Sequence, residues 1–171
     1  MKSKQSTLLV GLGNPILGDD GVGWRIVEQV EKAYQQDRAN GSSLHEVDFE
    51  YLSLGGLSLM EHMEGYQDVI VVDSILTKSH PHGTIYSLPL SGLPDFSSGH
   101  TTAIHDTSLA NALNVGRKMG MVLPEDVWVV AVEAEYVFDF SEELSSPVEA
   151  AVPDAVEIVL EMLHRDLRKE K

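Results

Sequence analysis

Apolar and polar residues follow one another in blocks that predict strands and helices in alternation. Residues 7–12 and 69–72 are continuous apolar runs, typical of strands that are covered on both faces of a sheet. Residues 44–54 alternate in part and predict another strand, and residues 127–132 predict a further buried one. Residues 83–88 predict a strand at a sheet edge, because prolines flank them.

Between these strands, apolar residues recur at intervals of three or four, the spacing of an amphipathic helix. Residues 87–102 are rich in Gly, Pro and Ser and predict a loop. Strands that alternate with helices favour a three-layer α/β/α sandwich around a largely parallel, twisted sheet of about five strands. The expected helix starts are, in chain order, Val22, Ser58, Asp106 or Thr107, and Pro147 or Pro153.

The length and charge of the chain indicate how many domains it forms and which partners it can bind. The 171 residues suit a single domain, residues 1–171, with an ordered core at about 7–164. The net charge of −15 repels nucleic acid and anionic membranes, so neither is an expected partner. There are no cysteines, which excludes thiolate chemistry. The apolar run near the start of the chain is too short, and too often interrupted by glycine and polar residues, for a signal peptide. We therefore expect a cytoplasmic protein, and a monomer.

Candidate chemistry lies where predicted strands end. Asp19 and Asp20 follow the first strand, Asp73 follows the run 69–72, and His105 lies at or just before a helix start. The carboxyl ends of parallel strands share one edge of a sheet, so these side chains can converge there. Two carboxylates and one imidazole suit Zn²⁺, Ni²⁺ or a similar ion. Each residue also has an ordinary structural interpretation, as a turn residue or helix cap, and for Asp19 we expect an exposed cap.

The glycine-rich turn at residues 11–23 resembles a nucleotide-binding loop only in part. A dinucleotide fingerprint needs a third glycine where this chain has Ile16. Asp19 and Asp20 would also place negative charge beside the pyrophosphate, where a helix N-terminus normally receives an anion. The glycines of the turn allow close backbone packing, but the negative charge of its two aspartates favours a cation rather than a phosphate.

The same residues resemble a known family. The pattern Gly11-x-Gly13-Asn14-x4-Asp19-Asp20-Gly21-x-Gly23 is similar to the N-terminal signature of the [NiFe]-hydrogenase maturation endopeptidases. Asp73 after its strand and His105 before Leu109 also match that family's order. The resemblance implies a metal-dependent protease that removes the C-terminal extension of the nickel-loaded hydrogenase large-subunit precursor. It assigns metal-binding and catalytic roles to Asp20, Asp73 and His105, with nickel supplied by the substrate and no organic cofactor.

Two departures and two alternatives accompany the resemblance. Some members have Glu where this chain has Asp20, and residues 54–57 (Leu-Gly-Gly-Leu) replace a turn associated with substrate recognition. The second difference favours the protease of a bidirectional, NAD-coupled hydrogenase.

A non-catalytic, nickel-dependent docking protein or chaperone for the large subunit is the main alternative function. Peptidyl-tRNA hydrolase shares the opening Val-Gly-Leu-Gly-Asn-Pro, but the charge of −15 opposes tRNA binding.

Overall fold

The computed structural model describes residues 4–42, 45–92, 101–125, 127–135, 137 and 140–164, with backbone alone at 4–5 and 101–108. Its strands are β1 (Lys4–Leu12), β2 (Val47–Leu52), β3 (Tyr66–Ile75), β4 (Ile85–Pro89) and β5 (Val127–Glu133). Its α-helices are α1 (Val22–Ala39), α2 (Gly56–His62), α3 (Thr101–Lys118) and α4 (Ser146–His164), and η1 (Gly18–Gly21) and η2 (Leu90–Gly92) are short 3-10 helices.

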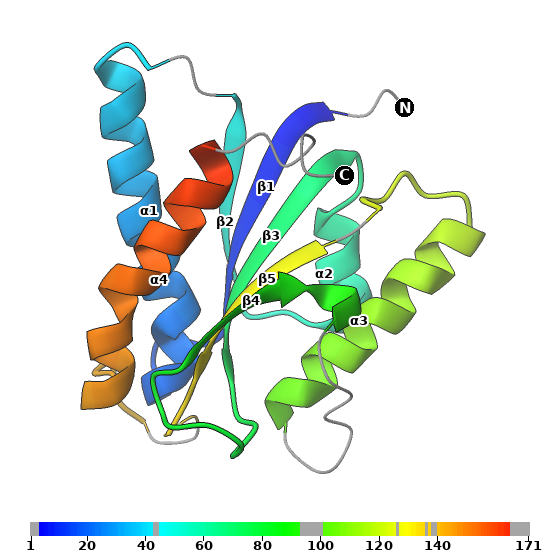
Figure 1. The fold of residues 1–171 in the computed structure, drawn as a ribbon. Coiled ribbons are helices and arrows are strands. Elements are labelled where there is room, and N and C mark those ends of the chain that lie inside the picture. Colours follow the sequence, from blue (N-terminus) through cyan, green and yellow to red (C-terminus); the bar gives the residue numbers. More distant parts are fainter. Residues whose placement is uncertain are drawn as a thin grey trace.

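The five strands form one sheet in the order β2-β1-β3-β5-β4. The pairs β1–β2, β1–β3 and β3–β5 are parallel, and β4 runs antiparallel to β5 at the edge. Helices α1 and α4 cover one face of the sheet, and α2 and α3 cover the other (Figure 1). The predicted three-layer α/β/α sandwich, its largely parallel sheet and its edge strand are confirmed.

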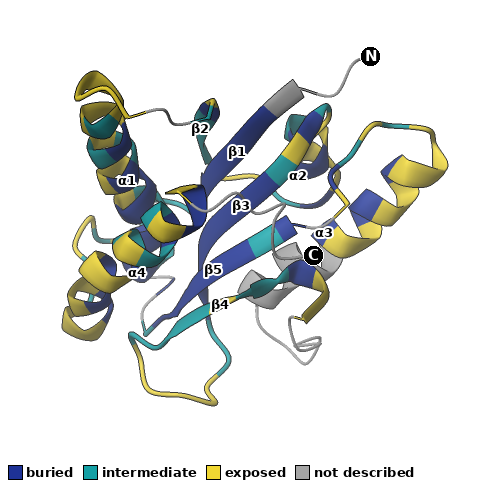
Figure 2. Cartoon of the chain, turned by 45° about the horizontal axis from the view of Figure 1, so that its top comes forward, coloured by how far each residue is buried: buried dark blue, intermediate teal, exposed yellow. Residues whose placement is uncertain are grey.

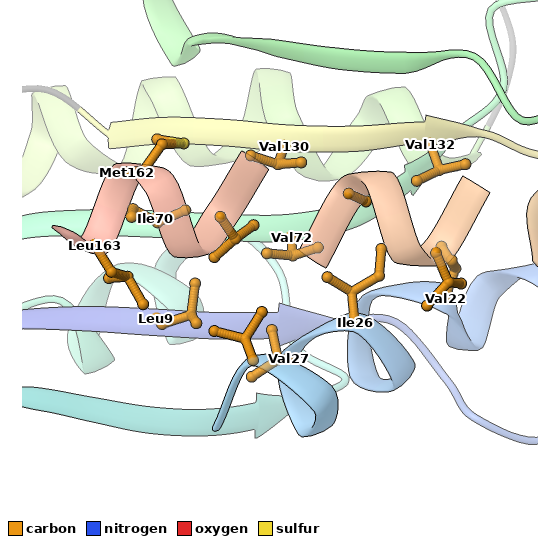
Figure 3. Close-up of a cluster of buried hydrophobic side chains, with 14 of the residues drawn as sticks. Leu9, Val22, Ile26, Val27, Ile70, Val72, Val130, Val132, Met162 and Leu163 are labelled. Atoms are coloured by element: carbon orange, nitrogen blue, oxygen red, sulfur yellow. The ribbon is translucent and has the colours of Figure 1, made fainter. Parts of the chain in front are cut away.

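The core consists of two apolar layers, one on each face of the sheet. In β3, Ile70 and Val72 pack in the layer beneath α1 and α4, and Val69 and Val71 pack in the opposite layer. Figure 2 shows β1, β3 and β5 buried along most of their length, and Figure 3 shows Ile70 and Val72 among the side chains of the first layer. Burial on both faces explains why these strands are continuous β-branched runs. No helix among the described residues is both long and apolar enough to cross a bilayer.

Several helix and strand boundaries in the structure differ from the predicted ones. The third helix begins at Thr101, so the prediction of a cap at Asp106 or Thr107 is wrong, and β4 continues to Pro89 within the predicted loop. Asp and Thr weaken a helix interior by only about 0.7 kcal/mol or less each, too little to stop a helix that packs on α2 through Leu109. Residues 93–100 of that loop and the predicted basic last turn at 165–169 lie outside the described residues.

The loop between β3 and β4 is attached to the sheet by a buried carboxylate. Glu133 at the end of β5 has no solvent exposure. Its Oε1 accepts hydrogen bonds from the backbone N–H groups of Thr77 (2.8 Å) and Lys78 (2.9 Å), and its Oε2 accepts from the hydroxyls of Thr77 (2.6 Å) and Tyr86 (2.8 Å). Burial raises the pKa of Tyr86, so its hydroxyl stays protonated and can donate.

We predict that Glu133→Gln lowers the free energy of unfolding by about 1–3 kcal/mol, since the amide NH₂ of Gln cannot accept the hydrogen bonds that one carboxylate oxygen of Glu133 now accepts. Urea unfolding followed by circular dichroism measures the change. Glu157→Gln, at an exposed position of α4, is the control and should remain within about 0.5 kcal/mol of the parent. Equal midpoints for both variants would show that the Glu133 carboxylate does not secure this loop.

Candidate active site

Glycines, which have no side chain, allow the turn after β1 to lie against the sheet. A Cβ on Gly13 would lie 1.8 Å from the carbonyl oxygen of Asp20, and the φ of Gly13 is +121°. A Cβ on Gly23 would lie 2.3 Å from the carbonyl oxygen of Val72 and 2.4 Å from that of Leu12. Real Cβ atoms do not approach this closely, so only glycine fits either position. The glycines therefore serve close backbone packing, as the sequence indicates, and the turn leads directly to Asp20.

Asp20 and Asp73 line one cavity of about 160 Å³. The Oδ2 of Asp20 accepts a hydrogen bond from the backbone N–H of Asn14 (2.8 Å), and its Oδ1 accepts a longer one from the Ser74 hydroxyl (3.4 Å). Asp73 is 5% exposed, and its Oδ1 accepts from the backbone N–H of Ser74 (2.8 Å). Two acidic residues that are far apart in the chain thus line the same small space.

The topology explains this meeting. Strand β1 pairs with β2 on one side and with β3 on the other, so the chain changes direction across the sheet at β1. Ligand sites of open α/β sheets lie at such a switch point, outside the carboxyl ends of the strands. Asp20 follows β1, and Asp73 lies near the carboxyl end of β3. The cavity therefore occupies the position that the fold favours for a site.

The third predicted ligand lies in a helix. His105 is the fifth residue of α3, one turn inside it, rather than at its start, and its side chain lies outside the described part of the structure. Helix α3 begins near the end of the molecule at which β1 and β3 end (Figure 1). Among the side chains that the structure describes, no group of three His, Asp or Glu residues could hold a metal ion. Of the three predicted site residues, the cavity therefore brings together Asp20 and Asp73.

Asp19 differs from the prediction. The sequence predicts an exposed helix cap, but the side chain is fully buried, and the N-cap positions of η1 and α1 are Leu17 and Gly21. Its carboxylate instead accepts hydrogen bonds from Glu135 and Ser145, 116 and 126 positions further along the chain. Partners this distant leave no local signal in the sequence.

The cavity also has walls that the sequence pattern does not single out as candidates. Asn14 belongs to the glycine turn, and Ser53 and Leu54 follow β2. The Ser53 hydroxyl donates to the carbonyl of Gly13 (2.6 Å), which joins the ends of β1 and β2 beside the cavity. A place after a predicted strand, the signal that identifies Asp73, could have found Asn14. Ser53 and Leu54 lie inside the strand predicted at 44–54, which in the structure ends at Leu52, so the sequence gives no such signal for them.

The molecule is therefore an α/β protein in which two acidic residues line a cavity at the switch point of the sheet. Such an arrangement suits the binding of a cation or acid–base chemistry. Residues 24–162 match the family model described as hydrogenase maturation protease. This chain belongs to that family, which also rules against the peptidyl-tRNA hydrolase alternative.

Individual relatives agree with this assignment. The hydrogenase 2 maturation protease of Escherichia coli is 29% identical over 161 residues, covering 91% of this chain and 89% of that protein. The hydrogenase expression/formation protein HoxM of Cupriavidus necator is 26% identical over 156 residues, covering 91% of this chain and 73% of that protein. The solved hydrogenase maturating endopeptidase HybD from E. coli superposes with a TM-score of 0.69 at 27% identity, covering 96% and 93% of the two chains.

We predict that Gly13→Ala lowers the free energy of unfolding by about 3 kcal/mol, because the new methyl group meets the Asp20 carbonyl and the turn must move. Gly41→Ala is a matched control, since Gly41 also has a positive φ (+89°), but no atom of the described residues lies within 4 Å of where its methyl group would be. The control should lose only about 1 kcal/mol from backbone strain. Urea unfolding of both variants measures the difference, and equal losses would mean that contact with Asp20 does not matter.

Proposed function

We propose that this protein cleaves the C-terminal extension from a nickel-loaded [NiFe]-hydrogenase large-subunit precursor. The observation that supports the proposal most directly is the shared cavity of Asp20 and Asp73. Ionised carboxylates that face one small space favour a divalent cation there. In this proposal His105 provides a third ligand, and the nickel belongs to the substrate. The proposal includes action in the cytoplasm, as a monomer and without an organic cofactor, nucleic acid or membrane.

The proposed reaction is hydrolysis of one peptide bond. Nickel that is coordinated by the site and by the precursor orients the scissile region, and it can polarise a carbonyl or lower the pKa of a bound water. Water adds to the carbonyl carbon, and a carboxylate of the cavity accepts its proton. The C–N bond then breaks, and a proton passes to the departing amine. Asn14 and Ser74 orient Asp20 for this role through their hydrogen bonds.

We predict that Asp20→Asn, Asp73→Asn and His105→Ala each lower the rate of precursor cleavage at least about 100-fold. Changes to residues behind a metal ligand already cost about 10–100-fold, and these changes remove the proposed ligands themselves. The assay mixes each variant with nickel-loaded precursor and follows the shortened product on a denaturing gel. Asp154→Asn, at an exposed position of α4, is the control and should cleave at the parent rate.

Two outcomes of that assay would contradict the proposal. Parent-like cleavage by all three variants would show that the reaction takes place elsewhere. A stable complex of the parent protein with precursor of unchanged length would favour the non-catalytic docking function instead.

We also predict that the parent protein cleaves nickel-loaded precursor and leaves nickel-free precursor intact, because the ion links the substrate to the carboxylates. The two precursors are compared at equal concentration, and nickel is then added back to the second. Equal cleavage of both forms would refute recognition through nickel while leaving the protease activity in place.

A further inference from the structure

The carboxylate of Asp19 connects three separate parts of the chain. Its Oδ2 accepts a hydrogen bond from the backbone N–H of Glu135 (2.8 Å), just beyond β5. Its Oδ1 accepts from the backbone N–H of Ser145 (2.7 Å), and the Ser145 hydroxyl also donates to Oδ2 (2.8 Å). The side chain has no solvent exposure. A buried carboxylate persists only where such donors replace water, so these contacts define its position.

The neighbouring backbone strengthens this connection. The N–H of Gly18 donates to the carbonyl of Ser141 (2.7 Å), and the N–H of Ser141 donates to the carbonyl of Ile16 (3.1 Å). A guanidinium nitrogen of Arg25 donates to the carbonyl of Glu142 (2.9 Å). Residues 140–145 are thus fastened to the turn that carries Asp19 and Asp20, with Asp19 at the buried end of the contact.

Helix α4 supplies an electrostatic reason for a carboxylate here. Ser145 directly precedes α4, and its carbonyl accepts a hydrogen bond from the N–H of Glu149 (2.8 Å). The N-terminal end of a helix carries partial positive charge, which stabilises a negative group beside it. The negative charge of Asp19 therefore suits this place better than a neutral side chain of the same size.

We propose that Asp19 is a positioning residue for Asp20, an inference that rests on the proposed function. The two are successive residues of η1, and successive side chains of a 3-10 helix diverge by about 120°. With Asp19 fixed among Glu135 and Ser145, Asp20 is directed to the other side, where it lines the cavity. Asp19 is not among the residues that line the cavity, so it acts through Asp20 and not on the substrate.

The hydrogen bonds of Asp19 indicate which substitution is informative. Asn has the same shape, but its amide NH₂ would face at least one of the N–H groups that Asp19 now accepts from. The turn must then shift, and a displacement of about 1 Å in a reacting group can cost about 100-fold in rate. Ser145→Ala removes the hydroxyl donor alone and leaves both backbone donors in place.

The test measures single-turnover cleavage of nickel-loaded precursor at saturating enzyme, and separately the Kd for nickel-free precursor. We expect Asp19→Asn to lower the saturating rate about 10–100-fold while the Kd stays within about 2-fold of the parent value. We expect Ser145→Ala to lower the rate about 3–10-fold, with the double variant no slower than Asp19→Asn alone. Ser146→Ala, an exposed neighbour, is the matched control and should equal the parent.

The outcomes separate this inference from the proposed function. Absence of cleavage by the parent protein overturns the proposed function, and the inference with it. Cleavage by the parent together with a saturating rate within about 2-fold for Asp19→Asn overturns the inference alone. A rate and an affinity that fall in proportion to the folded fraction, followed by circular dichroism, mean a structural role and also overturn it. If Asp19→Asn does not fold, Ser145→Ala decides, and an unchanged rate overturns the inference.

Discussion

The close approach of the glycine turn to the ends of β1 and β3 is the constraint on which the site depends. Gly23 allows the start of α1 to touch the carbonyls of Leu12 and Val72, and Gly13 allows the backbone of Asp20 to lie beside the end of β1. Val72 directly precedes Asp73. The contact that packs α1 on the sheet is therefore also the contact that brings Asp20 to Asp73, so packing and chemistry share one geometric requirement.

The two adjacent aspartates of this turn answer different requirements. Asp19 is turned inward, where backbone donors and the N-terminus of α4 replace its hydration. Asp20 is turned to the cavity, where hydrogen bonds from Asn14 and Ser74 orient it and leave it next to space for a ligand. Equal residue types thus serve structure and chemistry because a tight turn sends successive side chains in different directions.

The sequence predicts those features that depend on local burial. Strands covered on both faces must be continuous apolar runs, so residues 7–12, 69–72 and 127–132 are identifiable, and the predicted place of Asp73 follows from where a run ends. The buried roles of Asp19 and Glu133 are not identifiable, because their donors come from distant segments. The start of α3 escapes prediction because weak local preferences of Asp and Thr yield to packing.

The sign of the charge at the turn separates two functions that share similar backbone patterns. A strand, a glycine turn and a helix N-terminus form an anion site when the turn leaves its N–H groups open to a phosphate. Here the N–H of Asn14 donates to the carboxylate of Asp20, so the chain's own anion occupies a donor that a nucleotide would need. That same carboxylate then presents negative charge to the cavity shared with Asp73. Because an internal anion replaces the external one, this α/β switch point suits the cation-bearing substrate that we propose better than it suits a nucleotide.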